Sequence, residues 1–509
     1  MKKATKLQVL LAVLFMLSSL LTACGGNPVA PDEPADPAVT DNSASDPVDN
    51  TESDPAPALE KITYMSKDLY SDADFTSLWV DMFEADTGVK MEATAIPSNG
   101  WEDKVTASFM SGQLPDVARL PSNLYPFVKQ ELLLPLDEYI ENNSAIKQIL
   151  EDNPGSVEPF KFFGEIYGIS ISNAKYMTIW IRQDWLDKLN MEMPANKDEF
   201  IEMLRAFRDN DLDGNGKNDT IPLTMPATLQ PMDMFAAFFG TRNEVYMKDG
   251  KSVVPFRTEE YKEFMEFMKT LYDEGLIDKE IPTNTSYGTI REKFNTGVAG
   301  AAVMWDDTSS SFISGLAKSG IDGKIAFMPA FKSEDGRGAM GMSYFAADSP
   351  ISLTTSCENP QAVFDTFFDW YLNSANGIIS TSVGLQGYNF EVVDGKVVAD
   401  VEKGIGFHGQ SFPPVNQDYE YPFEFDETYQ FKYDCIAELA SNGSDLGSLV
   451  NTEFVPSDNT AFANISGDLT AKMQELFHSY LVGSMDYDQY LAAFEAYAAE
   501  VGLDETVVG

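Results

Sequence analysis

Basic residues are scarce in this chain. It has 35 Lys and Arg against 80 Asp and Glu among 509 residues, which gives a formal net charge of −45. A surface this negative repels nucleic acid and anionic membrane surfaces, so the composition argues against both as partners. The balance suits a soluble, exported protein, and 44% apolar residues are enough for most of the chain to fold.

Histidines and catalytic motifs are scarce as well. The two histidines, His408 and His478, do not form the His-x-x-x-His pair of zinc hydrolases. No phosphate-binding Walker loop and no Gly-x-Ser-x-Gly occurs. A glycosidase with paired carboxylates is not excluded by motif, because any two of the many acidic residues could be the pair. We expect a protein that is not an enzyme.

Three cysteines are too few for a disulfide framework. Cys24 belongs to the N-terminal motif Leu21-Thr-Ala-Cys24-Gly25, so Cys357 and Cys435 remain as candidates for a disulfide. The sequence leaves two alternatives open for them, a disulfide formed outside the cell or two free buried thiols.

The N-terminus predicts the compartment. Three lysines precede an apolar run over 9–17, which is too short for a transmembrane helix and is typical of a signal peptide. Leu21-Thr-Ala-Cys24-Gly25 then resembles a bacterial lipobox. That resemblance implies removal of the signal peptide 1–23, lipid on Cys24, and anchoring at the extracellular face of the cell membrane. The alternative is an ordinary signal peptide with a chance cysteine.

The stretch after Cys24 predicts a tether. Residues 25–58 hold eight acidic residues, seven prolines, no Lys or Arg and no aromatic residue. Such a segment cannot bury enough apolar surface to offset the entropy of ordering it. We therefore expect a disordered acidic tether over 24–58 and a folded domain over 59–509.

The folded part begins with a predicted βαβ unit, a strand at 61–65, a helix with apolar residues from Phe75 to Phe83, and a strand at 89–96. Alternation of strands and helices then continues without an internal repeat, which predicts an α/β protein in two lobes. Further helices are expected at 101–110, 124–140 with a break at Pro135, 183–189, 196–208, 258–274, 292–296, 360–372, 466–482 and 487–500. Further strands are expected near 117–120, 167–172 and 297–305, and the segment 346–354 is expected to be a strand or an extended linker.

An acidic loop follows the predicted helix 196–208. Carboxylate and amide side chains alternate in it, around two glycines, as in calcium-binding loops of the EF-hand type. The Glu expected at position 12 is absent, since Pro222 stands there. The alternative is a solvated turn of common composition. The predicted calcium ligands are Asp211, Asp213, Asn215, Lys217 through its carbonyl, and Asp219.

Aromatic residues recur at predicted strand ends and loops. The apolar faces of sugar rings stack on aromatic planes, and sugar hydroxyls need carboxylates or amides as partners. Trp79, Trp185 and Trp370 lie on predicted helix faces, where core packing is the better interpretation. The candidate ligand-binding residues are Trp101, Asp116, Tyr176, Trp180, Arg182, Trp305, Tyr344 and Tyr388.

The ordered set of short motifs resembles the extracellular solute-binding proteins, family 1, of bacterial ABC transporters, and within them a large lipoprotein group of Gram-positive bacteria. The resemblance covers residues 60–509. The motifs that carry it are Gly112-Gln-Leu-Pro-Asp-Val117, Leu134-Pro-Leu-Asp-Glu-Tyr139, Trp180 to Leu189, Asp211 to Pro222, Phe294-Asn-Thr-Gly297 and Gly384-Leu-Gln-Gly-Tyr388.

This resemblance implies a two-lobed α/β fold of the periplasmic-binding-protein type, with a multi-strand hinge and a ligand cleft between the lobes. It implies delivery of a small solute, here expected to be an oligosaccharide, to membrane permease subunits. Alginate-binding relatives hold a structural calcium in the matching acidic loop, with one further acid where this chain has Thr220. Two alternatives stay open, a secreted carbohydrate-active enzyme and a sensory binder for a membrane receptor.

Overall fold

The computed structural model describes residues 59–67, 73–97, 100–170, 175–345, 349–400, 414–416, 418–446, 453–454 and 459–507. The chain divides into a unit of residues 1–57 and a compact unit of residues 58–509. The predicted signal peptide, Cys24 and the tether lie outside the described residues. Within the described residues, no helix combines the length and the apolar character that a membrane span needs.

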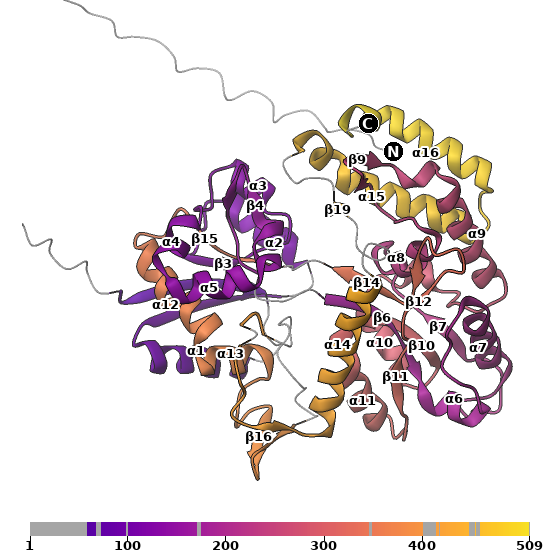
Figure 1. The fold of residues 1–509 in the computed structure, drawn as a ribbon, viewed down its shortest axis with the longest axis horizontal. Coiled ribbons are helices and arrows are strands. Elements are labelled where there is room, and N and C mark those ends of the chain that lie inside the picture. The colour runs from indigo at the N-terminus through magenta and orange to yellow at the C-terminus, as the bar shows by residue number, and fades with distance from the viewer. Residues whose placement is uncertain are drawn as a thin grey trace, which may run out of the picture. The chain divides into compact units, whose positions relative to one another are not determined.

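The first lobe is built on a four-stranded sheet in the order β15-β3-β1-β2 (Figure 1). Strands β1 (Lys61–Lys67) and β2 (Lys90–Ile96) are parallel and are joined by α1 (Ala73–Thr87), which confirms the βαβ unit. Strand β3 (Val117–Arg119) runs parallel to β1, whereas β15 (Ile351–Leu353) runs antiparallel to β3. A strand from residue 351 thus completes a sheet that begins at residue 61.

Helix α12 (Pro360–Asn373) covers part of this sheet because its apolar face carries five buried aromatic residues. They pack with Tyr64 of β1 and with the apolar stripe of α1. Trp79 and Trp370, predicted to be core residues, meet edge to face with ring centres 5.3 Å apart. That prediction is confirmed, and it is also confirmed for the fully buried Trp185 of the second lobe.

The second lobe has a five-stranded sheet in which β6 (Lys175–Arg182) is central. Its partners β10 (Ala299–Trp305), β11 (Ile325–Phe327) and β14 (Met342–Phe345) all run antiparallel to it, and β7 (Ile221–Thr224) runs parallel to β10. Alternate residues of β6 therefore face opposite sides of the sheet. Met177, Ile179 and Ile181 enter one hydrophobic cluster, while Tyr176 and Trp180 enter another.

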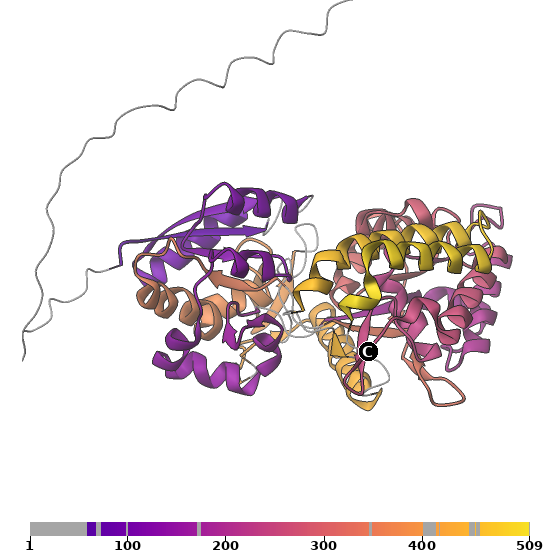
Figure 2. The ribbon, with the colours of Figure 1, turned by 90° about the horizontal axis from the view of Figure 1, so that it is seen from above.

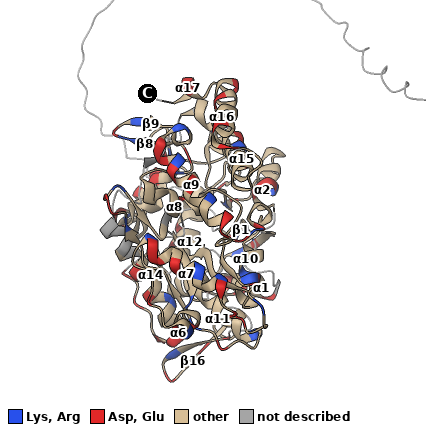
Figure 3. Cartoon of the chain, turned by 90° about the vertical axis from the view of Figure 1, so that its right-hand side faces the viewer, with Lys and Arg blue, Asp and Glu red and all other residues tan. Residues whose placement is uncertain are grey.

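Helices cover both faces of this sheet. The cluster of Met177 is shared with α6 (Gln183–Leu189), α7 (Lys197–Asp209), α9 (Glu259–Asp273), α15 (Thr460–Leu481) and α16 (Tyr487–Val501). Helices α15 and α16 lie side by side in Figures 1 and 2. The cluster of Trp180 is shared with α10 (Tyr287–Asn295), α11 (Ser309–Lys318) and α14 (Glu427–Leu446). In Figure 3 acidic positions recur along α14 and α16, as expected for a strongly acidic chain.

Both lobes are discontinuous in sequence. Residues 59–170 and 349–382 build the first lobe, and residues 175–345 with α14, α15, α16 and α17 (Leu503–Thr506) build the second. Two of the connections fall on residues 171–174 and 346–348, outside the described residues. The third carries a small sheet of β16 (Phe390–Val393), β17 (Lys396–Ala399) and β18 (Glu424–Phe425). The two-lobed α/β fold is confirmed.

Most predicted helices are found within a few residues, but one expectation was wrong. The segment 124–140 is not one broken helix: α3 (Tyr125–Lys129) and α4 (Asp137–Asn142) are separated by an extended stretch in which Leu133 pairs with Thr354. Pairing with a distant strand outweighed the local apolar pattern. The other helices are α2 (Trp101–Met110), α5 (Ser144–Asp152), α8 (Asp233–Ala236), α13 (Ala375–Ser382) and α17 (Leu503–Thr506). The other strands are β4 (Lys161–Phe162), β5 (Glu165–Ile166), β8 (Tyr246–Lys248), β9 (Lys251–Val253), β12 (Phe331–Lys332), β13 (Ala339–Met340) and β19 (Glu453–Phe454).

Cys357 and Cys435 are both free and buried, in different hydrophobic clusters. Burial raises the pKa of Cys357 to about 11 and that of Cys435 to about 12. Of the two alternatives that the sequence left open, the structure has the free thiols.

Candidate functional site

Aromatic candidates of the second lobe gather at one end of its sheet. Tyr344 of β14 pairs with Tyr176 of β6, and Trp305, the last residue of β10, pairs with Met177. Three of the predicted ligand-binding residues are therefore neighbours across strands, although 168 positions separate Tyr176 from Tyr344 in sequence.

Trp180 lies on the same face of β6 but is fully buried. Its ring packs edge to face against Phe312 and Phe327, each with ring centres 6.3 Å away, and its Nε1 donates a hydrogen bond to the carbonyl oxygen of Trp305 at 3.0 Å. A tryptophan enclosed in this way has no open face for a sugar in this structure. Its position favours support of Trp305 over stacking.

Tyr176 is also nearly buried, and its backbone N–H donates to Oδ2 of Asp306 at 3.0 Å. Asp306 follows directly after β10 and is itself buried. This hydrogen bond ties the beginning of β6 to the end of β10. It thereby fixes the point at which the chain leaves Trp305.

Trp305 is partly exposed and shares its surroundings with a residue that sequence reasoning missed, Tyr287. The two rings have centres 6.1 Å apart and planes inclined by 47°. Tyr287 is the first residue of α10, which Ser286 caps by accepting a hydrogen bond from the N–H of Gly288 at 3.0 Å. Burial raises the pKa of the Tyr287 hydroxyl to about 12, and the nearby side chain of the exposed Thr228 opposes that rise.

We call Trp305, Tyr287 and Thr228 the aromatic platform. It combines two partly exposed rings with a hydroxyl at the surface, which is the combination that sugar recognition requires. The only sequence signal for Tyr287 is an aromatic residue directly after a serine helix cap. That signal is too common to have singled it out.

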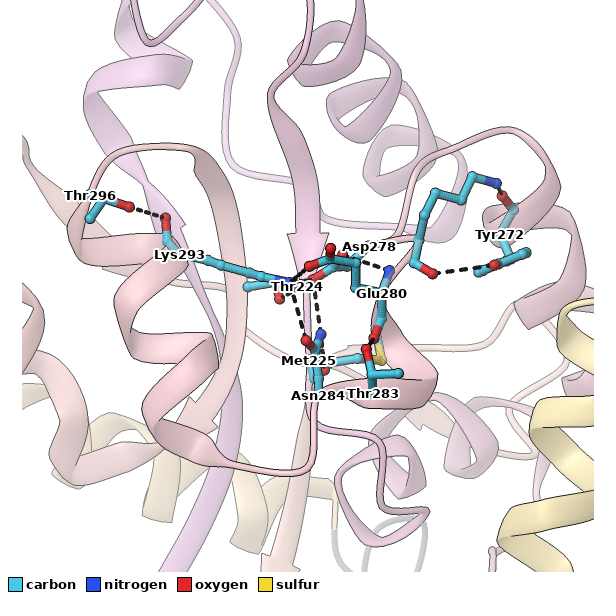
Figure 4. A network of polar contacts seen from close by, with 10 residues as sticks. Thr224, Met225, Tyr272, Asp278, Glu280, Thr283, Asn284, Lys293 and Thr296 are labelled. Carbon is cyan, nitrogen blue, oxygen red and sulfur yellow. Dashed lines mark hydrogen bonds and ion pairs between the residues drawn. The ribbon is translucent and has the colours of Figure 1, made fainter.

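A buried polar network around Asp278 joins β7 to α10 and to the segment before that helix (Figure 4). Asp278 is 3% exposed and accepts hydrogen bonds from Oγ1 of Thr224 at 2.8 Å, Nδ2 of Asn284 at 2.9 Å and Nζ of Lys293 at 2.7 Å. Burial opposes the charge of Asp278, but these hydrogen bonds outweigh it and lower the pKa of the carboxyl. The network joins the end of β7 to the segment that carries Tyr287.

The charge of Arg182 is paired with an acidic residue of the same lobe, Asp184. Its Nε and Nη2 donate to Oδ1 and Oδ2 of Asp184 at 2.8 and 2.7 Å, and its guanidinium lies 5.1 Å from the ring centre of Trp185. The side chain is 3% exposed. This arrangement favours a structural ion pair at the start of α6.

The remaining candidates belong to the first lobe. Trp101 begins α2 and is buried, with Nζ of Lys67 5.2 Å from its ring centre. Asp116 accepts hydrogen bonds from the N–H and the Oγ1 of Thr63, both at 2.7 Å, and so joins β3 to β1. Tyr388 is partly buried against Phe75 at 5.4 Å. The structure does not bring these three residues together.

The acidic loop after α7 is exposed, and its side chains point toward one another. Nδ2 of Asn215 donates to Oδ2 of Asp213 at 2.9 Å and to Oδ1 of Asp219 at 2.7 Å. Oδ1 and Oδ2 of Asp211 accept from the backbone N–H groups of Asn215 and Gly216. As they stand, no three His, Cys, Asp or Glu side chains among the described residues are grouped to hold a metal ion. The donor set is nevertheless the hard-oxygen set that calcium prefers.

Comparisons with known proteins identify the family to which this chain belongs. The fold is that of two-lobed solute-binding proteins. Residues 67–378, more than half of the chain, match the model of the family described as bacterial extracellular solute-binding protein. The chain belongs to this family.

Among its curated relatives, the lipoprotein LipO of Bacillus subtilis is 29% identical over 335 residues, which are 62% of this chain and 64% of LipO. The fructooligosaccharide ABC transporter substrate-binding protein FusA of Streptococcus pneumoniae is 30% identical over 226 residues, 40% of this chain and 42% of FusA. The chain thus matches less than two thirds of the length of either relative.

Solved structures share the fold across most of both chains. A solute-binding protein from Bifidobacterium longum infantis, described as binding HMO, has a TM-score of 0.66 at 17% identity and covers 88% of this chain and 97% of its own. The alginate-binding protein AlgQ2, in a crystal structure without calcium ion, has a TM-score of 0.64 at 21% identity, with coverages of 88% and 96%. At this level of identity the likeness establishes the fold alone.

Proposed function

We propose that this protein is the lipid-anchored, extracellular substrate-binding subunit of an ABC importer, and that it captures an oligosaccharide and delivers it to the permease. The observation that carries the proposal is the aromatic platform, in which Trp305 and Tyr287 offer two rings beside the hydroxyl of Thr228. Relatives that are named for fructooligosaccharide and polygalacturonan support a carbohydrate as the solute.

Binding needs no covalent chemistry. A solute that contacts both lobes stabilises the conformation in which it makes more contacts, by the difference between its affinities for the two conformations. Trp101, Asp116 and Tyr388 stay predictions for the contribution of the first lobe. In the second lobe the proposal places Trp305 and Tyr287 against the solute, with Trp180 and Tyr176 behind them.

The direct test is a thermal-shift screen of the full chain against kestose, maltotriose, oligogalacturonate and alginate oligosaccharides. A true solute raises the melting temperature in proportion to the logarithm of its concentration above Kd. Calorimetry with the best sugar then compares the wild type with Trp305→Ala. Phe163→Ala is the matched control, because Phe163 is an exposed aromatic residue of the first lobe, 65% accessible. Equal loss of affinity in both variants, or no sugar that binds, would contradict the proposal.

Calcium at the acidic loop is a structural part of this proposal. Asp211, Asp213, Asp219, the amide oxygen of Asn215 and the carbonyl of Lys217 would hold the ion, which supplies a fixed positive charge that pins the loop after α7. The Asn215 amide group already marks the point toward which Asp213 and Asp219 direct oxygen atoms. A solved structure of a FusA EF-hand mutant from Streptococcus pneumoniae supports such a loop in this fold.

The lipid anchor rests on the lipobox at Cys24 and on the relative named LipO. Mass spectrometry of the N-terminal peptide from membranes tests it. We expect a mature chain that begins at a lipid-modified Cys24, and a Cys24→Ser variant that is recovered in the medium. An unmodified N-terminus at another residue would contradict the lipid anchor, but it would not affect the proposal that the protein binds a solute.

A further inference from the structure

The loop after β7 is fastened at a second point. Next to Thr228 of the platform, Ala227 donates its N–H to the carbonyl oxygen of Asn284 at 2.9 Å. Its own carbonyl oxygen lies 2.6 Å from Nε2 of His478 on α15. Because a carbonyl can only accept, Nε2 carries the hydrogen. The neutral ring therefore leaves Nδ1 without a proton.

Nδ1 of His478 is buried and has no hydrogen-bond partner among the described residues. The ring packs edge to face against Phe477, with ring centres 5.5 Å apart. A second proton would place an N–H donor in this environment without an acceptor, which is unfavourable because the donor loses its hydrogen bond to water and gains none in the protein. The charged ring can avoid that cost by leaving the site, and it then releases the Ala227 carbonyl.

Burial lowers the pKa of His478 below the 6.5 of an unperturbed histidine, and the hydrogen bond to Ala227 opposes the shift only in part. No charged side chain contributes to it, and the loop 225–232 has no ionisable residue. Charged groups on α15 and on the helices packed against it act on other partners. Lys472 pairs with Glu475, Lys269 with Asp273, and Glu495 and Asp504 with Arg257, while Glu266 faces Tyr480.

We propose that His478 is a positioning residue: through the Ala227 carbonyl it holds Thr228, and with it the Tyr287–Trp305 pair, so that acidification loosens the aromatic platform and weakens sugar binding. The effect on sugar rests on the proposed function, whereas the effect on the platform does not. His478 touches no part of the platform directly. The connection passes from the imidazole to a backbone carbonyl, then along one peptide unit to Thr228, whose side chain lies close enough to Tyr287 to affect the pKa of its hydroxyl.

The first experiment needs no sugar. The full chain is labelled with 5-fluorotryptophan and ¹³C-histidine, the Trp305 signal is assigned with Trp305→Phe, and both labels are followed by NMR from pH 8 to 5. Only two histidine signals arise, from His408 and His478. We expect the Trp305 signal to shift with the same midpoint as His478, below pH 6.5.

His478→Gln keeps a neutral N–H donor at the reach of Nε2 and cannot charge. We expect it to keep the Trp305 signal of the wild type at pH 7.5 and to abolish its shift on acidification. In His408→Gln the shift should persist. The proposal would be overturned if the Trp305 signal did not shift as His478 titrates. It would also be overturned if His408→Gln abolished the shift.

The second experiment measures the affinity for the sugar that gives the largest thermal shift among kestose, maltotriose, oligogalacturonate and alginate oligosaccharides. We expect the wild type to bind it roughly threefold to tenfold more weakly at pH 5.5 than at pH 7.5, and His478→Gln to bind equally at both. Equal affinities in the wild type would overturn the inference while leaving the proposed function. If no sugar binds at pH 7.5, the proposed function fails, and the fluorine experiment alone decides the role of His478.

Discussion

Nε1 of Trp180 lies 3.0 Å from the carbonyl oxygen of Trp305 and donates a hydrogen bond to it. Two tryptophans that were equivalent candidates for stacking therefore have different positions, since one is enclosed by Phe312 and Phe327 and the other is partly exposed at a strand end. This difference separates residues that hold the platform from residues that form it.

Trp180→Phe tests the supporting role. The substitution keeps an aromatic ring in the core but removes the hydrogen bond, so we expect a loss of about 1 kcal/mol in the free energy of unfolding. Affinity for the sugar should fall less than in Trp305→Ala, for which we expect a loss of tenfold or more because the stacking surface itself is gone. Denaturant titration and calorimetry give the two quantities. If Trp180→Phe lost more affinity for the sugar than Trp305→Ala, Trp180 would be assigned to the ligand-binding surface instead.

Asp278→Asn should destabilise the second lobe by roughly 2–4 kcal/mol, because Lys293 then loses its buried counter-charge. The lowered pKa of Asp278 also predicts the pH dependence. Its stabilising contribution is complete above the ordinary carboxyl pKa and is lost as the pH falls through the lowered value, since the unfolded state takes up the proton first. Denaturant unfolding at several pH values between 3 and 7 should show that the free energy of unfolding depends less steeply on pH in the variant than in the wild type. Lys293→Met in the same background is the control, and it should restore part of the stability by removing a mostly buried ammonium group whose remaining acidic partner, Glu280, is exposed.

Calcium removal should lower the melting temperature of the wild type by a few degrees, because an ion that binds only the folded state stabilises it. Asp213→Asn should melt at the lower temperature with or without calcium. Asp198→Asn, which changes an acidic residue in the first turn of α7 outside the loop, is the matched control and should respond like the wild type. Sugar affinity at a temperature where all variants are folded should not change. A loss of affinity on chelation would assign the loop a direct role in binding.

Gly300→Ala probes the contact between β10 and the helices behind it. A Cβ at Gly300 would lie 2.5 Å from the rings of Phe207 and Trp185, so we expect a loss of about 1–3 kcal/mol from overpacking. Gly467→Ala offers the opposite case, since nothing lies within 4 Å of its added Cβ and it lies inside α15. That substitution should stabilise the protein by about 0.5–1 kcal/mol. Equal effects in thermal unfolding would show that the tight contact in β10 relaxes freely.

The sequence predicted local structure well where one face of an element is apolar. The stripe of α9 and the strand β10 appear close to their predicted bounds, since 3.6-residue periodicity and a continuous apolar run each favour one conformation. The long helix α14 was missed, because its aromatic residues pack onto different elements and leave no regular stripe. Trp79, Trp185 and Trp370 were correctly assigned to the core, whereas Trp180 was not, because nothing in the sequence reveals that three elements close over it.

The sequence by itself therefore determined the composition-driven and periodic features of this protein: the acidic surface, the alternation of strands and helices, the lipobox and the oxygen-rich loop. Only the tertiary structure decided which aromatic residues become neighbours. Strand register brings Tyr344 beside Tyr176 and Met177 beside Trp305, and the loop after β7 brings Thr228 to Tyr287. These contacts join residues far apart in sequence, so no local propensity encodes them. They follow from the burial of both faces of the β6 sheet, which fixes the register of every strand and with it the platform at its edge.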